Sequence, residues 1–418
     1  MYKHNNMQIE VLDSIMGSGK TVGIIDWMNK NPNKRFLYVS PLRTEVEDRI
    51  PKDCAMLDFV SPNTEEHRTK SEHLLEILNQ KKNVSFTHSL FMDMSKEHLK
   101  AIDEGDYTLV IDEEIDFIDA YSGSDYQETD ILTLEKSGHI KVDEDNLGKV
   151  VWTWSDEDFV EGGVYTRLKR MCDMEVLHCT KRNREMMVMH LPTALITVCE
   201  RVIVMTYRFE GSIMSQFMAM KGIGVDYFTD VKVSKTEAQV KKEASELIDI
   251  FETPSTRKVR KLSMGGGWYR DTAKKEDFKR IQSALLSACR KGKVDTVMYT
   301  LPKHVVVPEN KNKQSKIRLP GFHPDNCYVY CGTKATNDYA DKNVLVHAFN
   351  RFPLVSVSSY LQDYGFPIKE DDFALSECIQ WVWRSSIRRG EPIKLCFLVP
   401  RMRAIFEKWL DGWEDDLK

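Results

Sequence analysis

The chain has 418 residues and a formal net charge of −5, and 42% of its residues are hydrophobic while 29% are charged. This length and composition predict a globular protein of two or three domains and exclude a disordered or fibrous chain. The negative charge excludes an overall positive field for nucleic acid, although a local basic groove stays compatible with it.

Cysteine spacing and hydropathy indicate which kinds of site and which cellular location to expect. The nine cysteines include the pairs Cys172/Cys179 and Cys327/Cys331, whose spacings do not match a zinc site, so we expect buried free thiols. No apolar run reaches the roughly 18 residues of a membrane helix. The polar start at 1–6 does not resemble a signal peptide. The sequence therefore predicts a cytoplasmic protein without a membrane contact.

The first part of the chain alternates between short apolar strands and helices. Strands are predicted at 9–12, 36–39, 84–86, 109–111 and 202–205, and helices at 21–28 and 65–78. Short continuous apolar strands are typical of a parallel sheet that is covered on both faces. We therefore expect an α/β domain over residues 1–215.

Two segments interrupt this alternation. Residues from about 120 to 190 are rich in Asp, Glu, Lys and Trp, which indicates an insertion. Residues 216–280 are strongly charged and are interpreted as a linker or accessory segment. Within them, residues 232–251 predict an exposed helix.

A second alternation fills residues 281–418, which we interpret as a smaller α/β domain. Strands are predicted at 296–299, 328–330, 344–346 and 393–399, and helices at 281–289, 373–388 and 401–409.

The segment 14–21, SIMGSGKT, lies between the first strand and the first helix and has the pattern of a phosphate-binding loop. Gly17 and Gly19 let backbone N–H groups converge on a phosphate, around the intervening Ser18. Lys20 supplies a cation, and the hydroxyl of Thr21 is suited to Mg²⁺. The alternative is a glycine-rich turn that ends in Lys-Thr by chance. The first position carries Ser14 where the strict signature has glycine.

The strand at 109–111 runs into the acidic sequence DEEID, residues 112–116. Asp112 at the strand end is placed to hold Mg²⁺, and Glu113 is placed to polarise an attacking water. The alternative is an ordinary helix start, where acidic residues are favourable because they interact with the positive end of the helix dipole.

A third pattern lies near the C-terminus. Gln380, Arg384 and Arg388 are spaced by four and would share one helix face, from which an arginine could reach a γ-phosphate. The alternative is a solvated basic face opposite the apolar side chains of the same helix.

These three patterns occur in the order found in superfamily 2 helicases. The chain resembles DEAD/DEAH-like members of that superfamily, and in particular the compact helicase-like ATPases of bacteriophages. The segments 38–43, 86–89, 204–207 and 332–339 also resemble helicase motifs, and the block 374–395, ALSECIQWVWRSSIRRGEPIKL, is the part most specific to the phage type.

The resemblance implies a fold of two tandem RecA-like P-loop NTPase domains, with the insertion in or after the first. It implies ATP and Mg²⁺ as cofactors. Residue by residue, it assigns phosphate and Mg²⁺ to Lys20 and Thr21, metal and water to Asp112 and Glu113, and domain coupling to Thr206. It assigns γ-phosphate contacts to Gln380, Arg384 and Arg388, and contacts with a nucleic-acid backbone to Arg43, Thr87, Thr333 and Thr336.

The chain departs from the helicase pattern at two places. Glu114-Ile115 follows the acidic pair where many relatives carry Asp or His. Ile387 occupies the usual position of the second arginine, so Arg384, Arg388 and Arg389 all stay open as the arginine finger.

The sequence therefore predicts an ATP-dependent helicase or translocase. Its substrate is expected to be single-stranded or forked DNA rather than RNA, and a replication or recombination protein is a further possible partner. The alternative is an ATP-switched interaction protein that does not unwind nucleic acid. A P-loop kinase fits less well, because of the paired Asp112-Glu113 and the second α/β domain.

Overall fold

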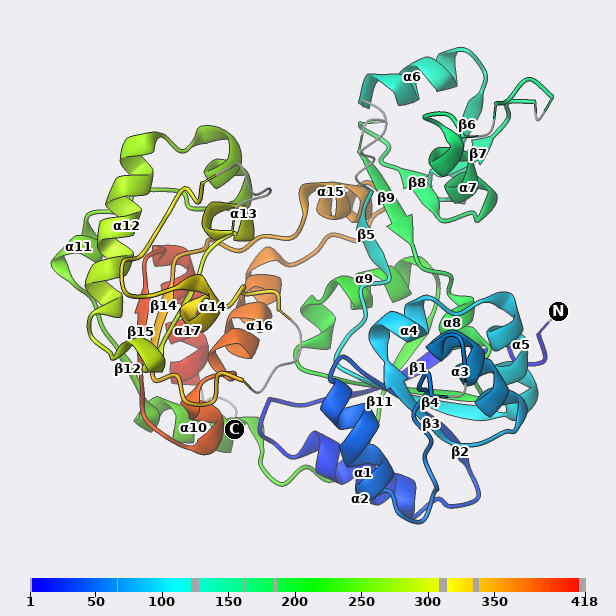
Figure 1. Cartoon of the computed structure of the whole chain (residues 1–418), viewed down its shortest axis with the longest axis horizontal. Helices are drawn as coiled ribbons and strands as arrows, with labels where there is room; N and C mark the ends of the chain where they lie inside the picture. Colours follow the sequence, from blue (N-terminus) through cyan, green and yellow to red (C-terminus); the bar gives the residue numbers. More distant parts are fainter. Residues whose placement is uncertain are drawn as a thin grey trace. The chain divides into compact units, whose positions relative to one another are not determined.

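The computed structural model describes residues 2–65, 67–121, 128–155, 157–160, 162–183, 186–307, 314–333 and 338–412. The chain forms two compact units. Unit 1 comprises residues 1–13, 21–231 and 353–369, and unit 2 comprises residues 14–20, 232–352 and 370–418. Each unit is built on a parallel sheet (Figure 1), which confirms the predicted α/β class.

The sheet of unit 1 has six parallel strands in the order β11-β1-β10-β4-β2-β3. The strands are β1 (Gln8–Asp13), β2 (Arg35–Ser40), β3 (Val84–Thr87), β4 (Tyr107–Asp112), β10 (Arg201–Thr206) and β11 (Gly224–Tyr227). Five of them are the predicted apolar runs, which are buried because helices cover both faces. β11 was not predicted, since all four of its residues are exposed at the sheet edge.

The helices of unit 1 are α1 (Lys20–Asn29), α2 (Ile50–Asp53), α3 (Lys70–Asn79), α4 (His88–Met92), α5 (Lys96–Gly105), α8 (Ala194–Thr197) and α9 (Ile213–Met220). The helix expected at 65–78 starts later, because the side chain of Thr69 accepts a hydrogen bond from the N–H of Glu72 and caps it there.

The predicted insertion folds as an antiparallel sheet of its own, in the order β5-β9-β8-β7-β6. Its elements are β5 (Ile118–Ala120), α6 (Glu128–Lys136), β6 (Ile140–Asp143), β7 (Lys149–Trp152), α7 (Thr166–Asp173), β8 (Leu177–Cys179) and β9 (Met187–His190). Ile131, Val150, Leu168 and Leu177 are fully buried in its core, so this inserted sheet has a hydrophobic core of its own.

A helix from the later part of the chain, α15 (Val355–Asp363), belongs to unit 1 and packs against β9 and β5. The hydroxyl of Tyr360 donates a 2.7 Å hydrogen bond to the carbonyl of Leu147, and Asp363 forms a 2.9 Å ion pair with Nε of Arg182. Beside Tyr360, the buried imidazoles of His178 and His190 stack with ring centroids 3.7 Å apart.

The sheet of unit 2 has four parallel strands in the order β12-β15-β14-β13. These are β12 (Ile248–Ile250), β13 (Val297–Thr300), β14 (Val344–His347) and β15 (Ile393–Phe397). The run at 328–330, predicted as a strand, forms only one bridge, between Tyr328 and Tyr299.

The helices of unit 2 are α10 (Glu237–Leu247), α11 (Pro254–Arg257), α12 (Lys275–Cys289), α13 (Lys303–Val306), α14 (Pro324–Cys327), α16 (Glu370–Val382) and α17 (Pro400–Asp411). The prediction of an exposed helix over 232–251 is wrong in two respects. α10 buries one face, including Ala238 and Ala244, and packs on α17, and its last predicted turn is the strand β12.

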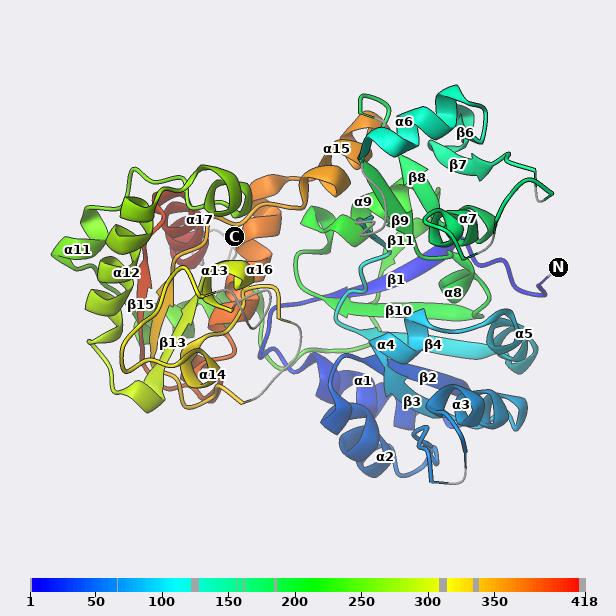
Figure 2. The ribbon, with the colours of Figure 1, turned by 45° about the horizontal axis from the view of Figure 1, so that its top comes forward.

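Figure 2 shows α12 on one side of β13 and β15 and α16 on the other. The chain crosses the sheet of unit 2 in two directions. It runs from β12 to β13 at the opposite edge and then returns through β14 to β15. α12 packs on β13 and β14, whereas α17 packs on β15. α12, in the connection that follows β12, and α17, which follows β15, lie on opposite sides of the strands (Figure 1). The carboxyl ends of these two neighbouring strands therefore form a topological switch point.

Candidate functional site

The loop from Ser14 to Thr21 connects β1 to α1 and has the backbone of a phosphate-binding loop. Gly17 and Gly19 have φ of +79° and +92°, a region that side chains disfavour. α1 begins at Lys20, so the N–H groups of its first turn and its positive dipole end lie at the loop. The ammonium of Lys20 donates to the carbonyl of Ser14, and the Ser14 hydroxyl donates to that of Ser18 at 2.8 Å. These features fit a bound phosphate, with Ser14 tolerated at the usual glycine position.

Residues 14–20 group with unit 2, where Ser234 holds the loop. The carbonyl of Ser18 accepts hydrogen bonds from the N–H and the hydroxyl of Ser234, both at 2.8 Å. A Cβ at Gly19 would lie 2.7 Å from the Ser234 hydroxyl, so this position excludes a side chain by space as well as by φ. The sequence did not point to Ser234, which is distant along the chain and carries no motif.

Asp112 is the last residue of β4 and lies in a polar cluster at the carboxyl edge of the unit 1 sheet. Its carboxylate accepts hydrogen bonds from the Tyr38 hydroxyl at 3.2 Å and from the Ser40 hydroxyl at 3.3 Å, while Nε2 of His88 lies 2.9 Å from its carbonyl. Burial, together with the negative charge of Asp112, raises the pKa of Tyr38 well above its usual value. Tyr38 therefore stays protonated and donates to Asp112.

Glu113 has a left-handed backbone, with φ of +64°, and its N–H donates to the carbonyl of Met205 at 3.0 Å. This conformation costs about 1–3 kcal/mol in a residue other than glycine and recurs at active sites, although seven other described non-glycine residues of this chain, such as Leu147 and Met264, also adopt it. The strain lies at the residue that the sequence predicts to polarise water.

The neighbouring strands bring further polar groups to this edge. Asp13 is paired in register with Thr206, and Met205 with Asp112, so the ends of β1, β10 and β4 lie side by side. The Thr206 hydroxyl donates to Glu114 at 2.7 Å. Asp13 accepts hydrogen bonds from the N–H groups that follow β10, at 2.7 and 2.9 Å. The loop at 14–21 leaves from this edge, because Ser14 directly follows Asp13.

The predicted helical face of Gln380, Arg384 and Arg388 does not exist in this form. α16 ends at Val382, and a 3-10 turn follows over Ser386–Arg389. The prediction of one helix over 373–388 is therefore wrong. Gln380 lies on α16, Arg384 is buried after the helix end, and Arg388 is exposed on the turn.

Within unit 2, this region nevertheless lies close to the loop at residues 14–20. The indole nitrogen of Trp383 is 3.7 Å from the position of a Cβ on Gly17. Trp381, Trp383 and Trp409 are all buried core residues, and Trp413 lies outside the described residues.

The predicted strand-binding residues divide between the units. Arg43 is exposed after β2, and Thr87 ends β3 in register with Ser40, so both lie at the carboxyl edge that carries Asp112. Thr333 lies in unit 2, where its N–H donates to the carbonyl of Tyr330. Thr336 falls outside the described residues.

The cysteines, the side chains able to ligate a metal and the hydropathy of the helices also bear on the expectations from the sequence. All nine cysteines are free and buried. Within the described ranges, no group of three or more His, Cys, Asp or Glu side chains is arranged to ligate a metal. The described helices include none with the length and hydropathy of a membrane span.

Comparison with known proteins gives likenesses over most of the chain. The SPbeta prophage-derived uncharacterized protein YonV of Bacillus subtilis (strain 168) is 28% identical over 427 residues, which cover 97% of this chain and 99% of that protein. Residues 242–410 match the family described as the YonV C-terminal Rossmann-like domain.

A solved structure of apo XPD matches with a TM-score of 0.53 at 15% identity, covering 97% of this chain and 96% of that chain. At this identity the likeness concerns the fold alone. Together with the two parallel sheets, it identifies the fold as two tandem RecA-like domains with an inserted antiparallel sheet.

Proposed function

We propose that this protein is an ATP-hydrolysing motor that moves along a nucleic-acid strand as a helicase or translocase. The observation that carries the proposal is a glycine loop with two left-handed residues, joined by one strand to the edge that holds Asp112 and the strained Glu113. A glycine loop of this kind can bind a triphosphate, and the two acidic residues can hold its Mg²⁺ and polarise the attacking water.

The proposed roles follow from these positions. Lys20 and the N–H groups at Gly17, Ser18 and Gly19 bind the phosphates, and Thr21 and Asp112 hold Mg²⁺. Mg²⁺ bound with ATP supplies positive charge that stabilises the transferring phosphoryl group. Glu113 orients and polarises the attacking water.

Two further groups of residues complete the proposal. Gln380, Arg384 and Arg388 contact the γ-phosphate, which is supported by the position of the adjacent Trp383 against Gly17. Arg43, Thr87, Thr333 and Thr336 hold the phosphates of the strand, contacts that position a strand without reading its bases. We propose single-stranded or forked DNA as the substrate, and phage replication or recombination in the host cytoplasm as the setting, on the likeness to a prophage-derived protein.

The test is steady-state ATP hydrolysis with and without single-stranded DNA or RNA, at low and moderate salt. Stimulation that declines with salt is expected, because strand binding releases counterions. Lys20→Ala should abolish hydrolysis, whereas Lys30→Ala, in the turn after the far end of α1, should retain it. Equal activity of the Lys20 variant and the wild type would refute the ATP site.

The second candidate is an ATP-switched interaction protein. It is favoured by the inserted sheet, which has its own core and accounts for none of the motifs, and by the net charge of −5. Hydrolysis that requires Lys20 but does not respond to either nucleic acid would support this candidate.

A further inference from the structure

A charged cavity lies within unit 2 and is lined by none of the residues assigned above. It has a volume of about 560 Å³ and is lined by Glu252, Arg260, Arg403 and Glu407, over Phe397 and Pro400. It sits at the carboxyl ends of β12 and β15, because Glu252 follows β12 while Phe397 ends β15. This is the topological switch point of the sheet, where ligands bind in open α/β folds.

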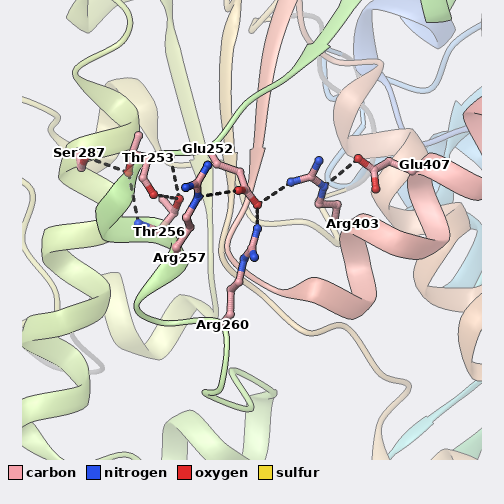
Figure 3. A network of polar contacts seen from close by, with 8 residues as sticks. All are labelled: Glu252, Thr253, Thr256, Arg257, Arg260, Ser287, Arg403 and Glu407. Carbon is pink, nitrogen blue, oxygen red and sulfur yellow. Dashed lines mark hydrogen bonds and ion pairs between the residues drawn. The ribbon is translucent and has the colours of Figure 1, made fainter.

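Three arginines gather around the carboxylate of Glu252, and two of them, Arg260 and Arg403, line the cavity (Figure 3). Glu252 accepts hydrogen bonds from Nη1 of Arg403 at 2.6 Å, from Nε of Arg257 at 3.1 Å and from Nη2 of Arg260. Arg403 also donates from Nε to Glu407 at 2.7 Å. The lining thus has two guanidinium groups and two carboxylates, and the third guanidinium, that of Arg257, pairs with Glu252 from outside the lining.

The two arginines that line the cavity keep donors for a ligand. Among the described residues, Arg260 hydrogen-bonds only Glu252, and Nη2 of Arg403 makes no hydrogen bond. Their side chains are 46% and 30% exposed, whereas that of Glu252 is 14% exposed. A ligand that enters the cavity therefore meets both guanidinium groups and the Glu407 carboxylate, which is 36% exposed, whereas Glu252 pairs with both arginines and is the least exposed of the four.

The surrounding backbone fixes this arrangement. Thr253 and Thr256 exchange hydrogen bonds between side chain and N–H in both directions, and Ser287 donates to the Thr253 hydroxyl at 3.0 Å (Figure 3). The segment between Glu252 and Arg257 is thus held before any ligand binds. Preformed donors of this kind bind planar or tetrahedral oxyanions strongly.

The edge of the cavity is also basic. Arg257, Lys258, Arg260 and Lys261 are exposed in one run, while Val259 between them is fully buried and anchors it. This run places a local positive patch on a chain whose net charge is negative. α17 begins at Pro400, so its positive dipole end adds to the same potential.

We propose that this cavity is a phosphate-binding site, in which Arg260 and Arg403 grip a phosphate group and Glu252 orients them. The phosphate comes either from a free polyphosphate or from the backbone of a nucleic-acid strand. Only the second source rests on the function proposed above, since no residue of the ATP site lines the cavity.

The test measures the affinity of the full-length protein for pyrophosphate and for a short single-stranded DNA, by calorimetry without ATP. Every variant carries Lys20→Ala, so that the phosphate loop does not contribute. Arg260→Gln is compared with Arg257→Gln. Both remove one exposed charge that pairs with Glu252, but only Arg260 lines the cavity.

Arg260→Gln should weaken binding about tenfold, as expected for losing a hydrogen bond between charged groups, while Arg257→Gln changes it less than about threefold. A loss for pyrophosphate identifies a free polyphosphate as the ligand, and a loss for DNA alone identifies the strand backbone. Equal effects of the two substitutions, or no effect of either, would overturn the proposal. Arg403→Gln should repeat the Arg260→Gln result, and melting curves check that each variant is folded.

Discussion

Glu113 is the residue at which backbone strain and predicted chemistry coincide. Glu113→Gln keeps the size of the side chain but removes the charge that polarises water, so ATP turnover should fall by about 10²–10⁴-fold while nucleotide affinity is retained. Asp116→Asn removes an exposed acid from the same segment and serves as the control. Turnover of the Glu113 variant within tenfold of the wild type would contradict the assigned role.

Thr206 links the end of β10 to Glu114 through a partly buried hydrogen bond. Thr206→Val leaves the carboxylate without this donor, so the free energy of unfolding should fall by about 1.5–3 kcal/mol. Urea denaturation measures the change. Thr206→Ser keeps the hydroxyl and should restore most of the loss. A Thr206→Val variant with the same free energy of unfolding as the wild type would contradict this contribution of the hydrogen bond.

The residues of the candidate site differ in how far the sequence predicts them. The positions of Gly17, Gly19 and Lys20 can be predicted from the sequence, because the turn and the helix start lie in one short segment. Tyr38 and Ser40 reach Asp112 only because β2 is paired with β4, an order that the sequence does not contain. The same holds for Ser234 against the phosphate loop.

At the scale of elements, continuous apolar runs predicted five strands of the first sheet correctly. β12 was missed because it has only three residues, of which Asp249 is exposed. The predicted helix over 373–388 was too long because Ile379, Trp383 and Ile387 continue the helical period past its end. The hydroxyl of Ser385 accepts from the N–H of Ile387 and starts a new turn, a local competition that periodicity does not detect.

The packing of α15 on the inserted sheet depends on two neutral histidines. Burial lowers the pKa of His178 from 6.5 to about 4 and also lowers that of His190. Neither ring nitrogen of His190 has a hydrogen-bond partner among the described residues. Lys221 adds positive charge nearby and disfavours their protonation.

We expect the stability of unit 1 to fall as the pH drops from 6.5 to about 4. Between these pH values the two histidines are protonated in the unfolded chain but stay neutral in the folded chain, so lowering the pH favours unfolding. His190→Phe keeps a ring against Phe217 and Tyr360 and removes one of the two groups, so the slope of unfolding free energy with pH should become smaller. Denaturant titrations at several pH values measure it. His139→Phe, a partly exposed control in the insertion, should leave the slope unchanged; equal slopes in both variants would refute the explanation.

At the scale of the whole molecule, each unit has a core of its own. Phe86→Ala in unit 1 and Phe406→Ala in unit 2 each empty a fully packed position and should cost about 3–5 kcal/mol. We expect two calorimetric transitions, of which each substitution lowers a different one. Val355→Ala, at an exposed position, should move neither. A single transition that both core variants lower would show that the units unfold together.

The path of the chain has a consequence for synthesis on the ribosome. Residues 353–369 complete unit 1, but they follow the whole of residues 232–352, which belong to unit 2. Folding during translation starts from the N-terminus. Unit 1 begins to fold first, but it cannot be completed by Tyr360 and Asp363 until most of unit 2 has left the exit tunnel. A product terminated at residue 231 would retain Lys20 and Glu113, but the surface beside His190 that α15 covers would face water and chaperones.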